Sequence, residues 1–201
     1  MEEASAKAQI VLIICDFPAV FPAYSFKRMK GPIRITSCAA LLCGIQLPFG
    51  LEIDEIEIST QPVTIDTKAK SAVVESATFV ARISKENLLS FLEKELPPQV
   101  TQPVLEFVEG KMVLTTKVKF IIEMQVEAEI GIEIREDRYL DVVLLSVDKP
   151  GPVAGIISAN LARQNPIFDI DDLPFEAKID SCIIDSEWVS VTGSGSQVLI
   201  D

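Results

Sequence analysis

The sequence predicts an elongated α+β domain, in which a long twisted antiparallel β-sheet wraps around two or three amphipathic helices. Three observations favour this class: a long alternation of apolar and polar residues, short turns between successive strands, and two short segments with helical signals. Short turns join antiparallel strands, whereas parallel strands need long crossover connections. A chain of 201 residues, of which 48% are hydrophobic, is long enough to bury a substantial core within one domain.

The segment 112–134 carries the strongest strand signal. Its even-numbered positions are apolar except for Thr116, while most odd-numbered positions are Lys, Glu or Gln. Side chains of a strand alternate between its two faces, so one face should be buried and the other exposed. An unbroken strand of this length would span about 70 Å, whereas a compact domain of this size is only about 40 Å across. We therefore expect either a turn near 123–125 or a long and strongly coiled sheet.

Further strands flank this segment on both sides. The pair Glu109-Gly110 joins strand 104–108 to it as a hairpin, and the polar turn 135–138 leads into strand 139–147. Strands that follow one another through short turns predict an antiparallel meander.

Two helices are expected between the strands. Ser84 is a suitable N-cap for a helix that Pro97-Pro98 ends. The second helix begins at the proline-rich segment 150–152 and ends at Asn165-Pro166.

Two segments of the chain resemble each other, and both begin with Leu-Pro-Phe. Residues 47–58 align with residues 173–184, which indicates a folded unit used twice unless the similarity is a coincidence. We predict an N-terminal segment of uncertain structure over 1–30, a single domain over 31–192 and a flexible tail over 193–201. The tail is expected because it begins with Gly-Ser-Gly-Ser.

The absence of histidine from the sequence argues against most catalytic and metal-binding sites. It removes Ser-His-Asp and Cys-His nucleophile systems, histidine general bases and histidine metal ligands. The four cysteines form no C-x-x-C pair and are interpreted as buried thiols. We predict no catalytic residues, no metal and no cofactor, and hence a protein that is not an enzyme. The cysteines are Cys15, Cys38, Cys43 and Cys182.

The acidic charge argues against nucleic acid as a partner. The formal net charge is −12, with 30 acidic and 18 basic residues, and a general nucleic-acid binder normally carries a basic face. One local basic cluster is either a solvated loop or a patch that contacts lipid phosphates. This cluster of headgroup candidates consists of Lys27, Arg28, Lys30 and Arg34.

The apolar face of the predicted sheet is longer than the helices can cover, and this mismatch favours an apolar ligand. Each helix has roughly a dozen residues and supplies a narrow apolar stripe. Uncovered apolar surface costs about 25 cal/mol per Å² in water, so an acyl chain or a partner protein would stabilise it. We predict binding, with transport as a further step, of phospholipid or another apolar ligand in a hydrophobic groove between sheet and helices. The alternative is an interaction or scaffold domain that dimerises through its apolar sheet face.

Candidate ligand contacts lie on the apolar faces of the two helices and of the long sheet, and ordinary core positions are the alternative for each. The candidates are Leu88, Leu89 and Leu92 in the first helix, Ile156, Ile157 and Leu161 in the second, and Phe120, Ile122 and Met124 in the sheet.

An ordered set of segments resembles the LmeA-like phospholipid-binding family. Residues 74–92 read VESATFVARISKENLLSFL, similar to the family's strand and the helix that follows it. Alternating strands, a helix opened by Pro and Gly and a closing Leu-Pro-Phe strand follow in the family's order, so the resemblance covers about 31–192. The chain departs from the family at Glu86-Asn87-Leu88, where Asp-Leu-Asn is frequent. The resemblance implies a fold similar to tubular lipid-binding proteins, phospholipid as ligand and no catalytic residues.

No export signal is recognised in the sequence, because Glu2 and Glu3 spoil a basic start before the short apolar stretch 8–14. The expected location is the cytoplasm or the periphery of a membrane, with the cell envelope as the alternative had a signal been removed. Peripheral membrane contact and a homodimer are compatible with this interpretation.

Overall fold

Two antiparallel sheets and two α-helices form the part of the chain that the structure describes. This computed structural model describes residues 9–16, 32–47, 50–66, 68–69, 71–108, 110–119, 123–148, 151–172 and 177–200. The elements are β1 (Gln9–Asp16), β2 (Ile33–Ile35), β3 (Ser37–Gln46), β4 (Glu52–Asp66), β5 (Ser71–Ser84), α1 (Lys85–Glu95), β6 (Val100–Val108), β7 (Lys111–Lys119), β8 (Glu123–Arg135), β9 (Tyr139–Val147), α2 (Pro152–Gln164), β10 (Phe168–Asp169), the 3-10 helix η2 (Ile170–Asp172), β11 (Lys178–Ile184) and β12 (Trp188–Ile200).

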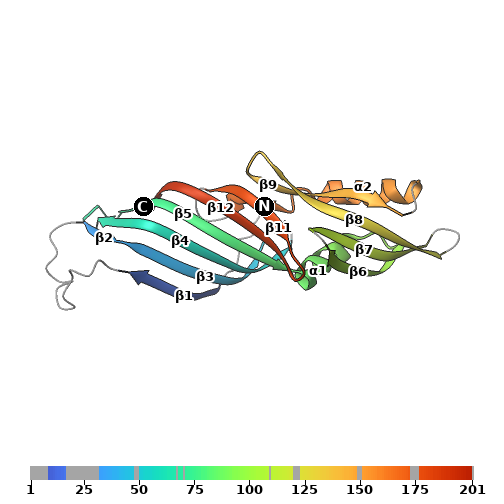
Figure 1. The fold of residues 1–201 in the computed structure, drawn as a ribbon, viewed down its shortest axis with the longest axis horizontal. Helices are drawn as coiled ribbons and strands as arrows, with labels where there is room; N and C mark the ends of the chain where they lie inside the picture. The colour runs from blue at the N-terminus through green and yellow to red at the C-terminus, as the bar shows by residue number, and fades with distance from the viewer. Residues whose placement is uncertain are drawn as a thin grey trace, which may run out of the picture.

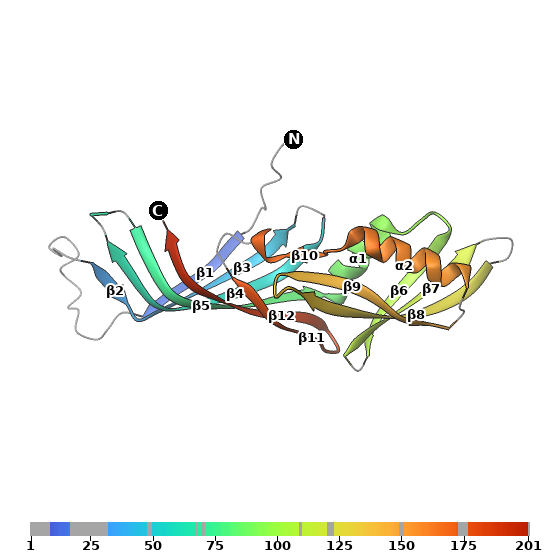
Figure 2. The same cartoon turned by 90° about the horizontal axis from the view of Figure 1, so that it is seen from above.

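The strands form two sheets rather than the single long sheet that the sequence predicts. Sheet A has the order β1-β3-β4-β5-β12-β11, with β2 also paired to β4, and sheet B has the order β10-β9-β8-β7-β6. Figure 1 shows the two sheets one after the other along the longest axis of the molecule, with α1 near their junction. Both helices lie on the same side of sheet B (Figure 2). The α+β class and the antiparallel pairing are confirmed.

A chain reversal divides the long alternating segment into β7 and β8. The two strands pair from Met112↔Ile130 to Lys119↔Glu123, so the chain turns back between Lys119 and Glu123. This is one of the two alternatives that the sequence left open. Even-numbered residues stand opposite even-numbered residues in this register, so the alternation keeps its phase across the turn.

The even-numbered positions of β7 and β8 face the core, as the alternation predicts. Met112, Val126 and Ile130 are fully buried. Thr116 is the polar exception, with 1% of its surface exposed. Its hydroxyl donates a hydrogen bond to the carbonyl oxygen of Thr101 at 3.0 Å, which satisfies the buried group.

The two similar segments, 47–58 and 173–184, lead into corresponding hairpins of sheet A. The hairpins are β4–β5 and β11–β12, and their second strands pair with each other in the order β4-β5-β12-β11. This arrangement supports a unit used twice. Most of the two Leu-Pro-Phe triplets lies outside the described residues. Leu47 is described, whereas Pro48, Phe49 and the second triplet, residues 173–175, are not.

An aspartate closes the turn of each of these hairpins. The Asp66 Oδ1 accepts hydrogen bonds from the amides of Lys68 at 2.8 Å and Ala69 at 3.1 Å. The Asp185 Oδ1 accepts from the amides of Glu187 and Trp188, both at 2.8 Å. Carboxylates that accept backbone hydrogen bonds in this way stabilise tight turns.

The predicted flexible tail is wrong for residues 193–200, which belong to β12. This strand pairs with β5 from Trp188↔Ser84 to Ile200↔Ala72. Gly193 is a packing position: a Cβ atom there would lie 2.1 Å from Cε1 of Phe79 and 2.3 Å from the carbonyl oxygen of Lys178. The glycine that suggested a loose linker thus makes room for an aromatic ring of the neighbouring strand.

The N-terminal segment, whose structure the sequence left uncertain, contains strand β1 at residues 9–16. Strand β1 pairs with β3 and lies at the edge of sheet A. No helix in the described part of the chain is both long and apolar enough to cross a bilayer.

The contact between Gly193 and Phe79 predicts a large effect of a single methyl group. Gly193→Ala should lower the free energy of unfolding by about 3 kcal/mol, because overpacking against a ring and a backbone carbonyl leaves little room for relaxation. The matched control is Gly155→Ala in α2, where no atom lies within 4 Å of the added Cβ. The control should gain about 1 kcal/mol of helix propensity. Urea unfolding measures both, and equal midpoints for the two variants would contradict this packing.

The turn of β11–β12 predicts a pH effect. Backbone hydrogen bonds from Glu187 and Trp188 lower the pKa of Asp185 below its ordinary value of 3.8. Because the folded pKa is the lower one, the stabilisation is complete above the unfolded pKa and is lost as the pH falls through the folded pKa. Carbon-detected NMR titration of the Asp185 carboxyl should give a midpoint below 3.8. Asp185→Asn should reduce the stability difference between neutral and acidic pH; an unchanged difference would argue against this role.

Candidate functional site

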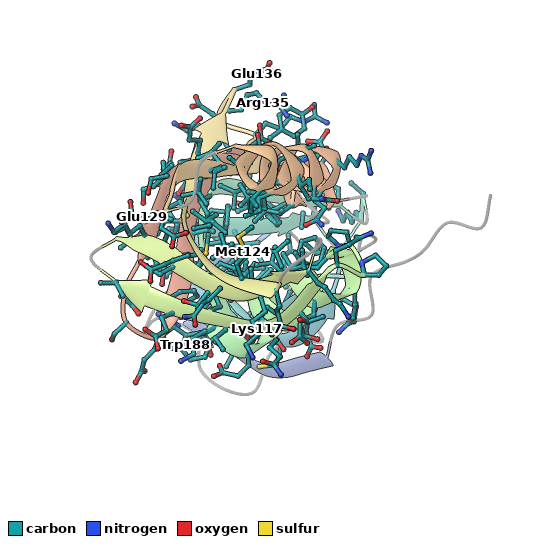
Figure 3. All side chains as sticks on the ribbon, turned by 90° about the vertical axis from the view of Figure 1, so that its right-hand side faces the viewer. Lys117, Met124, Glu129, Arg135, Glu136 and Trp188 are labelled. Carbon is teal, nitrogen blue, oxygen red and sulfur yellow. The ribbon has the colours of Figure 1, made fainter. Side chains whose placement is uncertain are left out.

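One apolar interior runs through both sheets and both helices. Its buried residues form a single contact cluster, which extends from Ile45 and Ile53 in sheet A through Leu88 in α1 to Met112 and Ile130 in sheet B. Figure 3 looks along the molecule from the sheet B end: Met124 lies inside, while Glu129, Arg135 and Glu136 lie at the outside. This interior is the candidate site, because it is where an apolar ligand would be shielded from water.

The first helix is anchored at the place where the two sheets meet. The Ser84 hydroxyl accepts a hydrogen bond from the amide of Asn87 at 3.3 Å, as the N-cap prediction requires. The amide of Ser84 itself donates to Oδ2 of Asp54 at 2.7 Å, which fixes the helix start to β4. Helix α1 then packs against β4 and β5 of sheet A and against β6 of sheet B. Its position therefore connects the cores of the two sheets.

The second helix packs along β9 of sheet B. Val153, Ile157 and Leu161 recur every four residues and are all buried, so they form the inward face of α2. The Asn165 amide closes the helix end: its Oδ1 accepts from the amide of Val142 at 2.8 Å, and its Nδ2 donates to the carbonyl of Val142 at 2.9 Å. This double hydrogen bond holds the end of α2 on β9.

The structure brings most of the predicted ligand contacts into this one interior. Leu88, Leu92, Ile157 and Leu161 are buried members of the main cluster, and Leu89 and Met124 are half-buried residues packed against it. Ile156 is half-buried on α2, whereas Phe120 and Ile122 lie outside the described residues. The predicted groove between sheet and helices therefore stays a prediction.

Half-buried apolar residues surround the main cluster. Such residues combine contact with the core and partial exposure, so they are the positions at which an additional apolar ligand would cover surface. They are Leu42, Ile58, Leu89, Leu96, Met124, Ile132, Ile134, Leu144, Val147, Ala177 and Cys182.

A second, smaller apolar cluster lies at the other end of the molecule. It consists of Ile35, Val63, Val74 and Ala77, with the half-buried Ile33, Cys38 and Ile65 packed against it. None of the helices among the described residues makes its main contacts with β1, β2 or β3. The outer part of sheet A is thus the place where the strands extend furthest beyond the helices, as Figure 1 shows.

Only one residue of the predicted headgroup cluster is described, since Lys27, Arg28 and Lys30 lie outside the described residues. Arg34 lies in β2, is 67% exposed and pairs with Glu75 at 3.4 Å. Strand β2 and the start of β8, where Met124 lies, are at opposite ends of the molecule (Figure 1). Arg34 and Met124 therefore mark two alternative places for a headgroup.

The described residues also line a polar cavity of about 350 Å³ outside the apolar interior. It is open to solvent between the start of α1 and the β11–β12 turn. Its lining residues are Ser84, Lys85, Glu86, Ser186, Glu187 and Trp188. Its polar lining does not suit an acyl chain.

A polar junction between the sheets was not predicted from the sequence. The turn after β8 accepts two backbone hydrogen bonds. The amide of Ile179 in β11 of sheet A donates to the Asp137 carbonyl at 2.6 Å, and the amide of Ile170 in η2, which follows β10 of sheet B, donates to the Arg138 carbonyl at 3.1 Å. The Arg138 side chain binds Asp169 at 3.1 Å, and this hydrogen bond raises the pKa of the arginine. The run 135–138 indicates a turn, but its sequence says nothing of its distant partners.

Two arginines flank one aromatic ring in this junction. The guanidinium carbons of Arg135 and Arg138 lie 4.4 Å and 4.9 Å from the centre of the Tyr139 ring. Arg135 also donates to Asp141 at 2.7 Å, which raises its pKa. Cation–π contacts and ion pairs at partly exposed positions each contribute modestly. Those of Arg135 and Arg138 lie within sheet B and support the turn that β11 contacts.

Comparisons with known proteins agree with the resemblance seen in the sequence. A profile of a family described as LmeA-like phospholipid-binding matches residues 33–194, which is most of the chain. No curated protein and no solved structure matches the chain. On the family match and the order of its strands and helices, this chain belongs to the LmeA-like phospholipid-binding family.

Proposed function

We propose that this protein binds a phospholipid without catalysing a reaction on it, with the acyl chains in the apolar interior beneath α1 and α2. The observation that carries the proposal is the single apolar cluster that passes through both sheets and both helices. Membership in a phospholipid-binding family supports the same ligand class. The proposal extends to transport of the lipid between membranes, at which the protein would dock peripherally. It also includes a location at a cytoplasmic membrane surface or in the cell envelope.

The half-buried residues around the cluster provide a physical reason for an acyl chain. Ile132, Leu144 and Val147 in sheet B contact the core and keep part of their apolar surface exposed. Covering such surface gains about 25 cal/mol per Å². An acyl chain offers apolar surface along its whole length, so it can cover several of these residues at once. No reacting group is needed for this binding.

We place the opening of the site at the sheet B end, beside Met124. Met124 is the second residue of β8, is half-buried and contacts the main cluster, and Figure 3 shows it inside the molecule at that end. The phosphate headgroup would then remain in solvent at the end of β7 and the start of β8, where Lys117 and Lys119 lie. Lys117 pairs with Glu123 at 3.5 Å, so its charge is available at this surface only as part of an ion pair.

Uptake of a fluorescent phosphatidylcholine by the full chain tests the proposal. Met124→Trp should reduce binding by roughly 5- to 150-fold, because a larger side chain at the opening must be accommodated at a cost of about 1–3 kcal/mol. Val104→Trp on the outer edge strand β6, where 51% of the valine is exposed, is the matched control and should bind as the parent does. Native mass spectrometry of the purified protein supplies the stoichiometry.

The possible results of this experiment distinguish whether the protein binds phospholipid from where on the molecule the phospholipid enters. Lipid-free protein that takes up no phospholipid would overturn the function. Normal uptake by Met124→Trp with reduced uptake by Arg34→Glu would keep the function and move the opening to the second cluster at the sheet A end. A dimer seen by light scattering, with no lipid uptake, would favour the interaction-domain alternative.

A further inference from the structure

The strand register places two of the four cysteines opposite each other. In the pairing of β1 with β3, Cys15 stands directly across from Cys38. The pairs on either side, from Leu12↔Leu41 to Asp16↔Ser37, are regular, because the register shift lies earlier, between Ile10 and Leu12. The two residues are therefore cross-strand partners in an uninterrupted antiparallel ladder.

We propose that Cys15 and Cys38 form a cross-strand disulfide when the protein meets a small-molecule disulfide oxidant. Directly opposed residues of an antiparallel pair have Cα atoms about 4.5 or 5.5 Å apart, depending on the type of pair. Both values fall within the range of about 4.4–6.8 Å that disulfides need. The backbone thus already has the separation that the bond requires, and only local adjustment of the strands is needed.

The other two cysteines have no cysteine opposite them in the described ladders. Cys43 stands across from Gln9 in β1 and Glu55 in β4, and Cys182 stands across from Val191 in β12. Cys38 and Cys43 share strand β3 but are five residues apart, which puts them on opposite faces at about 17 Å. The register therefore selects one pair among the four cysteines.

Burial lowers the reactivity of the Cys182 thiol. Its pKa is raised to about 11 because burial disfavours the charged thiolate. Only the thiolate attacks a disulfide, so Cys182 should be slow to exchange at mildly alkaline pH. Cys182 should therefore not compete with Cys15 and Cys38 for the oxidant.

The chemistry is two successive thiol–disulfide exchanges with glutathione disulfide as the oxidant. The thiolate of one cysteine attacks a glutathione sulfur, which forms a mixed disulfide and releases one glutathione. The thiolate of the opposite cysteine then attacks the protein sulfur of that mixed disulfide, which forms the Cys15–Cys38 bond and releases the second glutathione. The protein loses two electrons and two protons, and glutathione disulfide gains them.

The bond would fasten an edge strand. Strand β1 is at the end of the sheet A order, and β3 is its neighbour in that order. Edge strands expose unpaired backbone groups and are held by one ladder only. A covalent link to β3 should therefore shift the urea midpoint of unfolding upward in the oxidised protein.

Disulfide mapping of the full chain tests the proposal without any substitution. Reduced protein is incubated with glutathione disulfide under native conditions, quenched with an alkylating reagent, digested and analysed by mass spectrometry. We expect a peptide pair joined through Cys15 and Cys38, formed at least about tenfold faster than in urea, where the register is lost. In urea we expect mixed pairings that include Cys38 with Cys43, because short loops close most easily.

Two variants provide the controls. The double variant Cys43→Ser/Cys182→Ser should form the same bond at the same rate, whereas Cys15→Ser should stop at a glutathione adduct on Cys38. Separate glutathione adducts on Cys15 and Cys38 of the native protein, without the cross-link, would overturn the proposal. The same holds if native protein yields another cysteine pair as readily.

Discussion

The pairing of β5 with β12 is the constraint on which the rest of the structure depends. It joins the last described strand of the chain to a strand more than a hundred positions earlier and makes the two hairpins of sheet A into one surface. The same pairing delivers β11 to the junction with sheet B, where it meets the turn after β8. Phe79 and Gly193 lie opposite each other near the middle of this ladder, where the ring packs closely over the glycine.

The apolar interior follows from this arrangement, because α1 can reach both sheets only where they meet. Its start is fixed by Asp54 and Ser84, and its buried face then continues the core of sheet A into sheet B. The second helix extends that core along β9. The proposed phospholipid would have its acyl chains along this continuous core.

Much of this architecture could be predicted from the sequence, and the exceptions have physical causes. The caps of α1 and the alternation of β7 and β8 are local patterns, and the structure confirms them. The alternation did not decide between a turn and one long strand, because it keeps its phase through the turn between β7 and β8. The division into two sheets depends on pairings between distant strands, such as β5 with β12, which no local pattern encodes. The prediction of a flexible tail was wrong for residues 193–200 because a glycine-rich strand has the same composition as a linker. The Phe79 ring that packs over Gly193 comes from a strand that is distant in the sequence. Among the predicted ligand contacts, Leu88 and Leu92 are in the interior, but helix periodicity alone does not distinguish a ligand wall from core.

The junction of Arg135, Arg138 and Tyr139 has a consequence for how the molecule can change shape. The turn is bound to η2 on the sheet B side and accepts a hydrogen bond from Ile179 of β11 in sheet A, so a rotation of one sheet against the other would break the bond between Ile179 and Asp137. Hinge opening between the sheets would have to break this hydrogen bond. A ligand that enters beside Met124 would leave this bond intact, because Met124 and the turn lie at opposite ends of β8.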